Sequence, residues 1–253
     1  MQQSTLHLNV DGHTIPCLMG QPHAQKNAPV VLLLHGLNAN KEVQVNEMFH
    51  LCDAGWGAVV PDAPHHGERS NGHLQAMEQA DPLTRHRLFL EMVCEWAREL
   101  PGICGALQAQ GIQVHALAGI SFGAYVTYKA LASHLRLPVG IALLGSPSWE
   151  PMSDIPRESL RPLLFQAPIV SPGRLRECAL FAVHAALDDK VSPQGTLDLF
   201  DKLRNQGGVP PDRLRFLSYP HSGHTMRAED WWDAWRKIVF WLNAFAPKDR
   251  PLS

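Results

Sequence analysis

Apolar positions near the amino terminus alternate with polar ones. Leu6, Leu8 and Val10 fall on one side of the chain, and the alternation resumes at Ile15 after the pair Asp11-Gly12. Alternation of this kind on both sides of an Asp-Gly pair predicts two antiparallel strands joined by a tight turn.

Further along the chain the apolar residues form short continuous runs. Such runs are typical of strands that helices cover on both faces. They occur at residues 29–35, 57–61, 114–118, 140–144, 179–184 and 214–219, and stretches with helical periodicity lie between most of them. Strands that alternate with helices predict an α/β fold, here an eight-stranded, mostly parallel sheet with helices on both faces.

Residues that start and stop helices mark several boundaries. Asp81-Pro82 combines an N-cap with a proline at the first helical position, and we expect the helix that follows to stop near Pro101-Gly102. Its apolar face would carry Phe89, Val93, Trp96 and Leu100. The helix that opens at Ser192-Pro193 is expected to end at Gly207.

Residues 149–177 interrupt the alternation of strands and helices. The stretch is rich in proline, and its apolar cluster consists of Leu160, Leu163, Leu164 and Phe165. A long connection with little structure of its own is more often functional than incidental. We expect a small lid inserted into a single domain of residues 1–253, with an ordinary surface excursion as the alternative.

Composition and charge exclude some classes of protein. The 253 residues carry a formal net charge of -2, which gives no reason to expect a nucleic acid or an anionic membrane as partner. The amino terminus lacks the pattern of a signal peptide, and no apolar run approaches the roughly 18 residues of a membrane span. Five scattered cysteines without C-x-x-C spacing predict buried or inert thiols and a cytoplasmic location. The sequence does not indicate an oligomeric state.

The pentapeptide Gly119-Ile-Ser121-Phe-Gly123 matches the nucleophile-elbow pattern G-x-S-x-G. A serine raised at the end of a strand requires a sharp turn in strained geometry, and side chains at the two glycine positions would collide with the neighbouring strand and helix. An apolar strand precedes this motif and a helical stretch follows it. We therefore expect Ser121 to be a nucleophile; Ser146 and Ser148 lack the second glycine and a helix start.

Hydrolases with such an elbow carry the acid and the histidine later in the chain, each in a loop after a strand. Asp188 and His224 satisfy this order. Asp188 is preferred to Asp189 because it lies three residues before Val191, in a G-x-x-D-x-x-V arrangement. His224 is preferred to His221 because Gly223 gives the backbone room. Imidazole can accept and return a proton near neutral pH, and the carboxylate fixes its tautomer.

The segments Leu34-His-Gly-Leu37 and Pro61–Ser70, the Ser121 elbow, the Asp188 loop and Gly223-His224 occur in this order over nearly the whole chain. Together they resemble the α/β-hydrolase superfamily, in particular its compact bacterial esterases related to dienelactone hydrolases and prolyl-oligopeptidase-like enzymes. The resemblance implies the α/β-hydrolase fold, a carboxylic-ester hydrolase without a cofactor, and a structural role for the turn Pro61–Ser70.

Two residues depart from the family pattern. His65 and Ala185 occupy positions that are usually glycine, and neither change removes a catalytic group. A dienelactone hydrolase proper would have a cysteine nucleophile, which argues against that specific activity here.

The resemblance also implies an oxyanion hole. Its donors should be the backbone N–H groups of Leu37 and Phe122, the residue after the nucleophile, and losing one such donor typically costs roughly 3 kcal/mol of transition-state stabilisation. His35 is expected to be structural and to hold the loop by hydrogen bonds.

Two other classes of function compete with catalysis by serine. A metal site could use His65-His66 or His221 with His224, but no H-E-x-x-H or H-x-H-x-D-H pattern is present, so we expect no metal. A non-catalytic ligand-binding protein could share the fold, but it need not retain nucleophile, base and acid.

The expected reaction is hydrolysis of a small-molecule carboxylic ester through an acyl-enzyme on Ser121. Thioesterase, lactonase and small-peptide hydrolase activities would use the same groups and remain open. The small lid favours short to medium acyl chains. The pocket that selects them is expected to involve Trp149, Met152, Leu163, Leu164 and Phe165.

Overall fold

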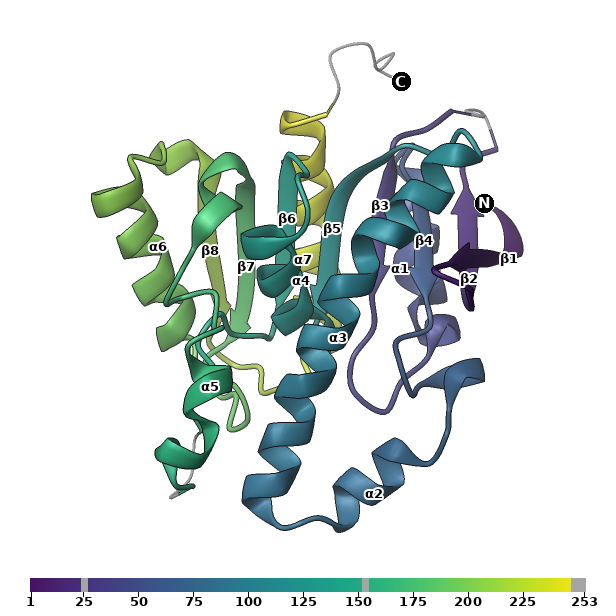
Figure 1. Cartoon of the computed structure of the whole chain (residues 1–253). Helices are drawn as coiled ribbons and strands as arrows, with labels where there is room; N and C mark the ends of the chain where they lie inside the picture. Colours follow the sequence, from purple (N-terminus) through teal and green to yellow (C-terminus); the bar gives the residue numbers. More distant parts are fainter. Residues whose placement is uncertain (24–26, 152–154, 247–253) are drawn as a thin grey trace.

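A single eight-stranded sheet runs through the molecule, with the strand order β1-β2-β4-β3-β5-β6-β7-β8 (Figure 1). The computed structural model describes residues 1–23, 27–151 and 155–246. The strands are β1 (Gln2–Val10), β2 (His13–Gln21), β3 (Val30–Leu34), β4 (Gly57–Pro61), β5 (Val114–Ile120), β6 (Val139–Leu143), β7 (Ala179–Ala185) and β8 (Leu214–Tyr219).

Strands β1 and β2 form the hairpin that the alternating pattern predicts. Leu8 pairs with Ile15, and the turn residues Asp11 and Gly12 both have positive φ, as a two-residue hairpin turn requires. β2 is antiparallel to β4, and all the remaining pairs are parallel. The predicted mostly parallel, eight-stranded sheet is confirmed.

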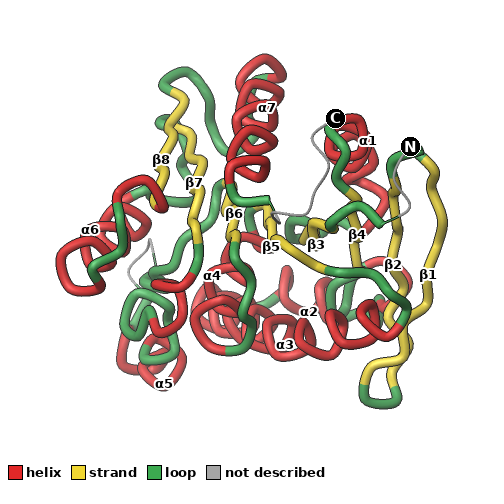
Figure 2. Tube along the Cα trace, turned by 90° about the horizontal axis from the view of Figure 1, so that it is seen from above, coloured by secondary structure: helices red, strands yellow, loops and turns green. Residues whose placement is uncertain are grey.

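Helices cover both faces of the sheet (Figure 2). α1 (Val45–Asp53) and α7 (Ala228–Ala244) pack on one face, and α3 (Pro82–Ala109), α4 (Phe122–Ser133) and α6 (Gln194–Gly207) pack on the other. The strands β3 to β7 are almost wholly buried, because each face contacts a separate apolar core. This double burial explains why their sequences are continuous apolar runs.

The prediction that the third helix stops near Pro101-Gly102 is wrong. α3 continues through Pro101 to Ala109. A proline inside a helix removes one backbone hydrogen bond and costs about 3 kcal/mol. The helix continues because Ile103 and Leu107 extend the buried stripe and are fully buried. Gly102 lies against β1, where an added Cβ would approach Val10 Cγ1 to 2.4 Å.

The end of α6 also differs from the predicted one. α6 includes Gly207 as its last residue, so the glycine that stops the helix is Gly208, with a left-handed φ of 63°, one position beyond the glycine predicted as the stop. The helical stretch between β3 and β4 begins as a 3₁₀ turn, Lys41–Gln44, and becomes α-helical only at α1. Further 3₁₀ turns lie at Gly67–Arg69 and Pro211–Arg213, and a short helix that was not predicted, α2 (His73–Gln79), precedes α3.

The carboxyl ends of the parallel strands meet at the lower edge of the sheet in Figure 1, where α2 and α5 also lie. The segment 149–177 leaves β6 at this edge and contains the 3₁₀ turns Arg157–Leu160 and Gly173–Glu177 and the short helix α5 (Arg161–Leu164). Leu175 joins it to the main core, and Leu160 is also fully buried. In the part of the chain that the structure describes, none of the helices has the length and apolar character needed to cross a membrane.

Candidate active site

Ser121 occupies the turn between β5 and α4, in a backbone conformation that few residues adopt. Its φ is 52° and its ψ is -113°. The N–H of Ser121 donates to the carbonyl of Leu143 at 2.8 Å, and the serine carbonyl accepts from Ala124 and Tyr125 in the first turn of α4. These bonds hold the strained residue, and strain held in this way is a common feature of functional sites.

Steric collisions explain why both elbow positions are glycine, as expected from the sequence. A Cβ on Gly119 would lie 2.1 Å from the carbonyl oxygen of Gly123, and a Cβ on Gly123 would lie 2.4 Å from the carbonyl oxygen of Leu34 in β3. Both distances are far below any contact that real atoms make. The helix α4 can therefore approach the sheet closely only when neither position carries a side chain.

Three side chains from distant loops form a chain of hydrogen bonds. Ser121 Oγ lies 3.0 Å from His224 Nε2, and His224 Nδ1 lies 2.8 Å from Asp188 Oδ2. An ionised carboxylate can only accept, so His224 Nδ1 donates to Asp188 and Nε2 is left to accept the proton of the serine hydroxyl. The Asp188 side chain is fully buried, whereas the His224 side chain is 18% exposed. The geometry allows an imidazole open to solvent to take a proton from the hydroxyl.

The backbone of its own loop fixes the orientation of the Asp188 carboxylate. Its Oδ1 accepts from the N–H groups of Lys190 and Val191 at 2.9 and 3.0 Å, and its Oδ2 remains for His224. The spacing from Asp188 to Val191 thus has a direct physical meaning, since the valine N–H is one of the donors. The neighbouring Asp189 is exposed.

The loop after β7 and the loop after β8 are joined to each other by backbone hydrogen bonds. Ala186 N–H donates to Tyr219 O at 2.9 Å, and Leu187 N–H donates to Ser222 O at 3.0 Å. The Ser222 hydroxyl in turn donates to Asp230 at the start of α7, at 2.7 Å. This pairing brings the carboxylate and the imidazole together, and His221, on the same loop as His224, is exposed.

The loop after β3 lies beside the nucleophile on its other side. A Cβ added to Gly36 would lie 3.8 Å from Ser121 Cβ, and Leu37 follows in the same half-buried loop. Phe122 is the first residue of α4, where helix N–H groups have no partner within the helix. Both residues expected as oxyanion donors therefore belong to backbone segments that adjoin Ser121.

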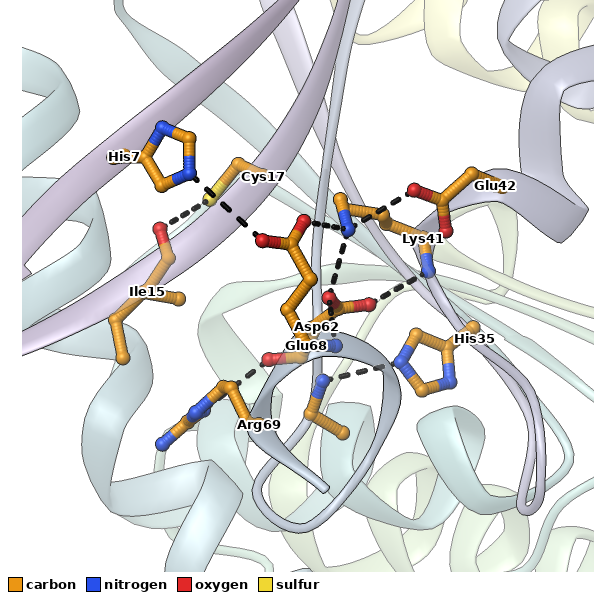
Figure 3. A network of polar contacts seen from close by, with 10 residues as sticks. His7, Ile15, Cys17, His35, Lys41, Glu42, Asp62, Glu68 and Arg69 are labelled. Carbon is orange, nitrogen blue, oxygen red and sulfur yellow. Dashed lines mark hydrogen bonds and ion pairs between the residues drawn. The ribbon is translucent and has the colours of Figure 1, made fainter.

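His35 is structural, as predicted. Its Nδ1 donates to the carbonyl of Gly36 at 2.9 Å, and its Nε2 accepts from the N–H of Ala63 at 3.1 Å (Figure 3). Burial lowers the pKa of His35 to about 4, so the ring is neutral and can hold both bonds at neutral pH.

Aromatic rings support the start of α4, a contribution that the sequence analysis missed. The rings of His66 and Trp96 each stack on Phe122 at centroid distances of 5.5 Å, and His35 contacts both of them at 5.2 Å. His66 is buried, and burial lowers its pKa. The sequence showed His65-His66 within the turn Pro61–Ser70 and Trp96 on an apolar helix face, but no local pattern connects these residues to Phe122.

The residues expected to form the substrate pocket occupy different environments. Trp149 is 1% exposed and packs in the main core, whereas Phe165 is 60% exposed. Leu163 and Leu164 are half-buried against the same core, and Met152 lies outside the described residues. A surface cavity of about 370 Å³ in this segment is lined by Glu150, Arg157, Glu158, Arg161, Leu164, Phe165 and Val170.

In the described part of the chain, most cysteines are buried and the histidines belong to no metal-binding cluster. All five cysteines are free, four are buried, and burial raises the thiol pKa of Cys17 and Cys178 to about 12. The expected burial is found at Cys17, Cys52, Cys94 and Cys178, and a protonated, buried thiol is a poor nucleophile. Within residues 1–23, 27–151 and 155–246, no group of three or more histidine, cysteine, aspartate or glutamate side chains could hold a metal ion.

Solved structures with similar folds span nearly all of the chain. TT1662 from Thermus thermophilus is 21% identical, with a TM-score of 0.73 over 97% of this chain and 98% of that one. A "Putative Dienelactone Hydrolase" from Klebsiella pneumoniae is 16% identical, with a TM-score of 0.72 over 96% of this chain and 98% of that one. The acylaminoacyl peptidase of Pyrococcus horikoshii is 15% identical, with a TM-score of 0.70 over 100% of this chain and 43% of that one. These structures confirm the predicted fold and its predicted similarity to dienelactone hydrolases and prolyl-oligopeptidase-like enzymes.

Sequence comparison leads to the same group of proteins. "Putative esterase YitV" of Bacillus subtilis (strain 168) is 25% identical over 228 residues, which cover 82% of this chain and 87% of the relative. The model of the "Alpha/beta hydrolase family" matches residues 31–253, which include the elbow and both loops that contribute Asp188 and His224. The chain therefore belongs to the alpha/beta hydrolase family.

Proposed function

We propose that the chain is a serine esterase that hydrolyses small carboxylic esters through an acyl-enzyme intermediate. The observation that carries this proposal is the pair of hydrogen bonds from Ser121 Oγ to His224 Nε2 and from His224 Nδ1 to Asp188 Oδ2, at 3.0 and 2.8 Å. The esterase relative in Bacillus subtilis supports the choice of an ester as the bond that is cleaved.

In this mechanism, His224 removes the hydroxyl proton as Ser121 Oγ attacks the ester carbonyl carbon. The carbonyl oxygen becomes an oxyanion, which accepts hydrogen bonds from the backbone N–H groups of Leu37 and Phe122. The imidazolium, stabilised by Asp188, then gives its proton to the departing alcohol.

The second half of the reaction repeats these steps with water. A water molecule loses a proton to His224 and attacks the acyl carbon, and the carboxylic acid leaves as Ser121 regains its proton. All the protons pass through one imidazole, and the one water molecule consumed for each ester balances the reaction.

Labelling with a fluorophosphonate probe tests the proposal. We expect one covalent label, on Ser121, and hydrolysis of p-nitrophenyl butyrate by the unmodified protein. Ser121→Ala should abolish both, whereas Ser148→Ala, which removes the competing serine after β6, should change neither. A label on another residue, or full ester hydrolysis by Ser121→Ala, would refute the assignment.

We also propose that the segment 149–177 acts as a small lid that restricts the acyl group to short or medium chains. Phe165 and Val170 are exposed apolar side chains on this segment, 60% and 49% exposed, and they line its surface cavity together with Leu164. A series of p-nitrophenyl esters from acetate to palmitate tests this size limit. The highest kcat/KM should occur at about eight carbons or fewer if the segment restricts the acyl group, and a maximum at palmitate would contradict it.

A further inference from the structure

A buried cluster of charges joins the loop after β3 to the loop after β4. Lys41 is 2% exposed and Asp62 is fully buried. The two residues are bonded twice, since Lys41 Nζ donates to Asp62 Oδ2 and the Lys41 backbone N–H donates to Asp62 Oδ1, both at 2.9 Å (Figure 3). One carboxylate therefore fixes both the side chain and the backbone of Lys41.

The turn that follows β4 closes around the same carboxylate. The Glu68 N–H donates to Asp62 Oδ2 at 3.1 Å, and its side chain accepts from Lys41 Nζ at 2.6 Å. Gly67 has a φ of 52°, and a Cβ at this position would lie 2.3 Å from Asp62 Oδ1. Arg69 donates to the Asp62 carbonyl and also pairs with Glu99 on α3. The turn is thus built against Asp62 from several directions.

Lys41 keeps its positive charge at neutral pH. Burial by itself would lower the pKa of Lys41, but its hydrogen bonds to Glu68, Asp62 and the exposed Glu42 outweigh that effect and raise the pKa above its ordinary value. A buried ion pair of this kind contributes little net stability, because its attraction is largely cancelled by desolvation. We therefore expect the pair mainly to fix the arrangement of the two loops that it joins.

The geometry that it specifies is that of the loop carrying Leu37. Residues 36–40 lie between two anchors on the loop after β4: His35 accepts from the Ala63 N–H at one end, and Lys41 bonds to Asp62 at the other. Between these anchors Gly36 lies beside Ser121, and Asn38 adopts a left-handed φ of 59°. Hence a displacement of Lys41 is transmitted to the few residues next to the nucleophile.

We propose that the Lys41–Asp62 pair is a positioning device that holds the Leu37 N–H where the oxyanion forms. The inference rests on the proposed function, because it assigns a task to that oxyanion donor. Oxyanion donors act only when they are already in place, and a displacement of about 1 Å can lower the rate roughly 100-fold. Neither residue touches the substrate; both act through the backbone of residues 36–40.

The test compares an ester with the matching thionoester, p-nitrophenyl acetate against p-nitrophenyl thionoacetate. Sulfur is a weak hydrogen-bond acceptor, so the thionoester gains little from the oxyanion donors. In the Asp62 carboxylate, Oδ2 accepts from the Glu68 N–H and from the Lys41 ammonium. Asp62→Asn replaces one carboxylate oxygen with an NH₂ group, which can only donate. We expect it to lower kcat/KM for the ester about 30- to 100-fold, mostly in kcat, and for the thionoester less than about fivefold.

Glu42→Gln is the matched control, because it removes an exposed partner of the same ammonium and leaves Asp62 intact. Both substrates should change less than about twofold in this variant. If Asp62→Asn does not fold, Lys41→Met/Asp62→Asn, which removes both charges, should show the same selective loss on the ester. An equal loss on both substrates, or no loss in a folded variant, overturns the inference. Ester hydrolysis that survives Ser121→Ala would instead refute the proposed function.

Discussion

The two sides of Ser121 are built in different ways. On the side of β7 and β8, Asp188 and His224 are joined by one hydrogen bond, and the imidazole is 18% exposed. On the side of β3 and β4, Lys41 and Asp62 form a buried ion pair below the loop that lies next to the serine. Each side has its own loops, and β5 with the start of α4 separates them.

The difference follows from the chemistry proposed for each side. An imidazole that gains and loses a proton in each half-reaction needs a charged partner and access to water. A backbone N–H never titrates, so the loop that presents it can be fixed by permanent charges that remain out of contact with solvent. Polar residues near one site thus serve two purposes in this proposal, proton transfer on one side and geometry on the other.

The largest expected effect concerns the titrating side. Asp188→Asn keeps the size of the side chain but removes the charge that orients and stabilises the imidazolium, so kcat should fall by about 10³–10⁴. Asp189→Asn, at the exposed neighbouring position, should change kcat less than about threefold. Steady-state kinetics with p-nitrophenyl butyrate measure both. The reverse order of effects would transfer the acid role to Asp189.

At the start of α4, which lies between the two sides, Gly123 should not tolerate an added side-chain atom. Gly123→Ala places a Cβ 2.4 Å from the Leu34 carbonyl oxygen, and we expect a loss of at least about 3 kcal/mol in the free energy of unfolding. Gly105→Ala is the control, since its Cβ would meet nothing within 4 Å inside α3 and should stabilise the protein by about 0.5–1 kcal/mol. Urea denaturation measures both values. A Gly123→Ala protein as stable as the parent would show that close packing at the elbow is not needed.

A smaller expected effect is a pH dependence of the free energy of unfolding, to which both sides contribute. Each side has a buried neutral histidine at the end of a strand: burial lowers the pKa of His35 after β3 and of His184 in β7 to about 4. The unfolded chain takes up these protons at higher pH than the folded one does. Stability is therefore fully present above about pH 6.5 and decreases as the pH falls toward 4, by on the order of 2 kcal/mol for each histidine.

Urea denaturation at pH 7.0 and 4.5 measures this loss. His184→Gln should reduce the difference between the two pH values, because it removes one of the buried histidines that are held neutral, and His221→Gln, at an exposed position, should leave it unchanged. A stability that is equal at both pH values would show that neither histidine is held neutral in the fold.

Much of the fold could be predicted because it depends on local sequence patterns. The continuous apolar runs of β3 to β7 reflect burial on two faces, and the elbow glycines reflect contacts that tolerate no side chain. The end of α3 was misjudged because Pro101 is a local stop signal, whereas the burial of Ile103 and Leu107 that overrides it depends on the distant sheet. The lid role of residues 149–177 stays a prediction.

Local sequence patterns were enough to predict the strands, most of the helices, and the serine, aspartate and histidine that follow strands in the order typical of hydrolases; α2 and the end of α3 were not predicted. Only the tertiary structure decided which atoms meet: that Asp188 Oδ2 reaches His224, that rings of His66 and Trp96 stack on Phe122, and that Lys41 pairs with Asp62. The physical reason is that periodicity and turn chemistry are local, whereas a hydrogen bond between residues 36 or 103 positions apart depends on how the sheet aligns its strands.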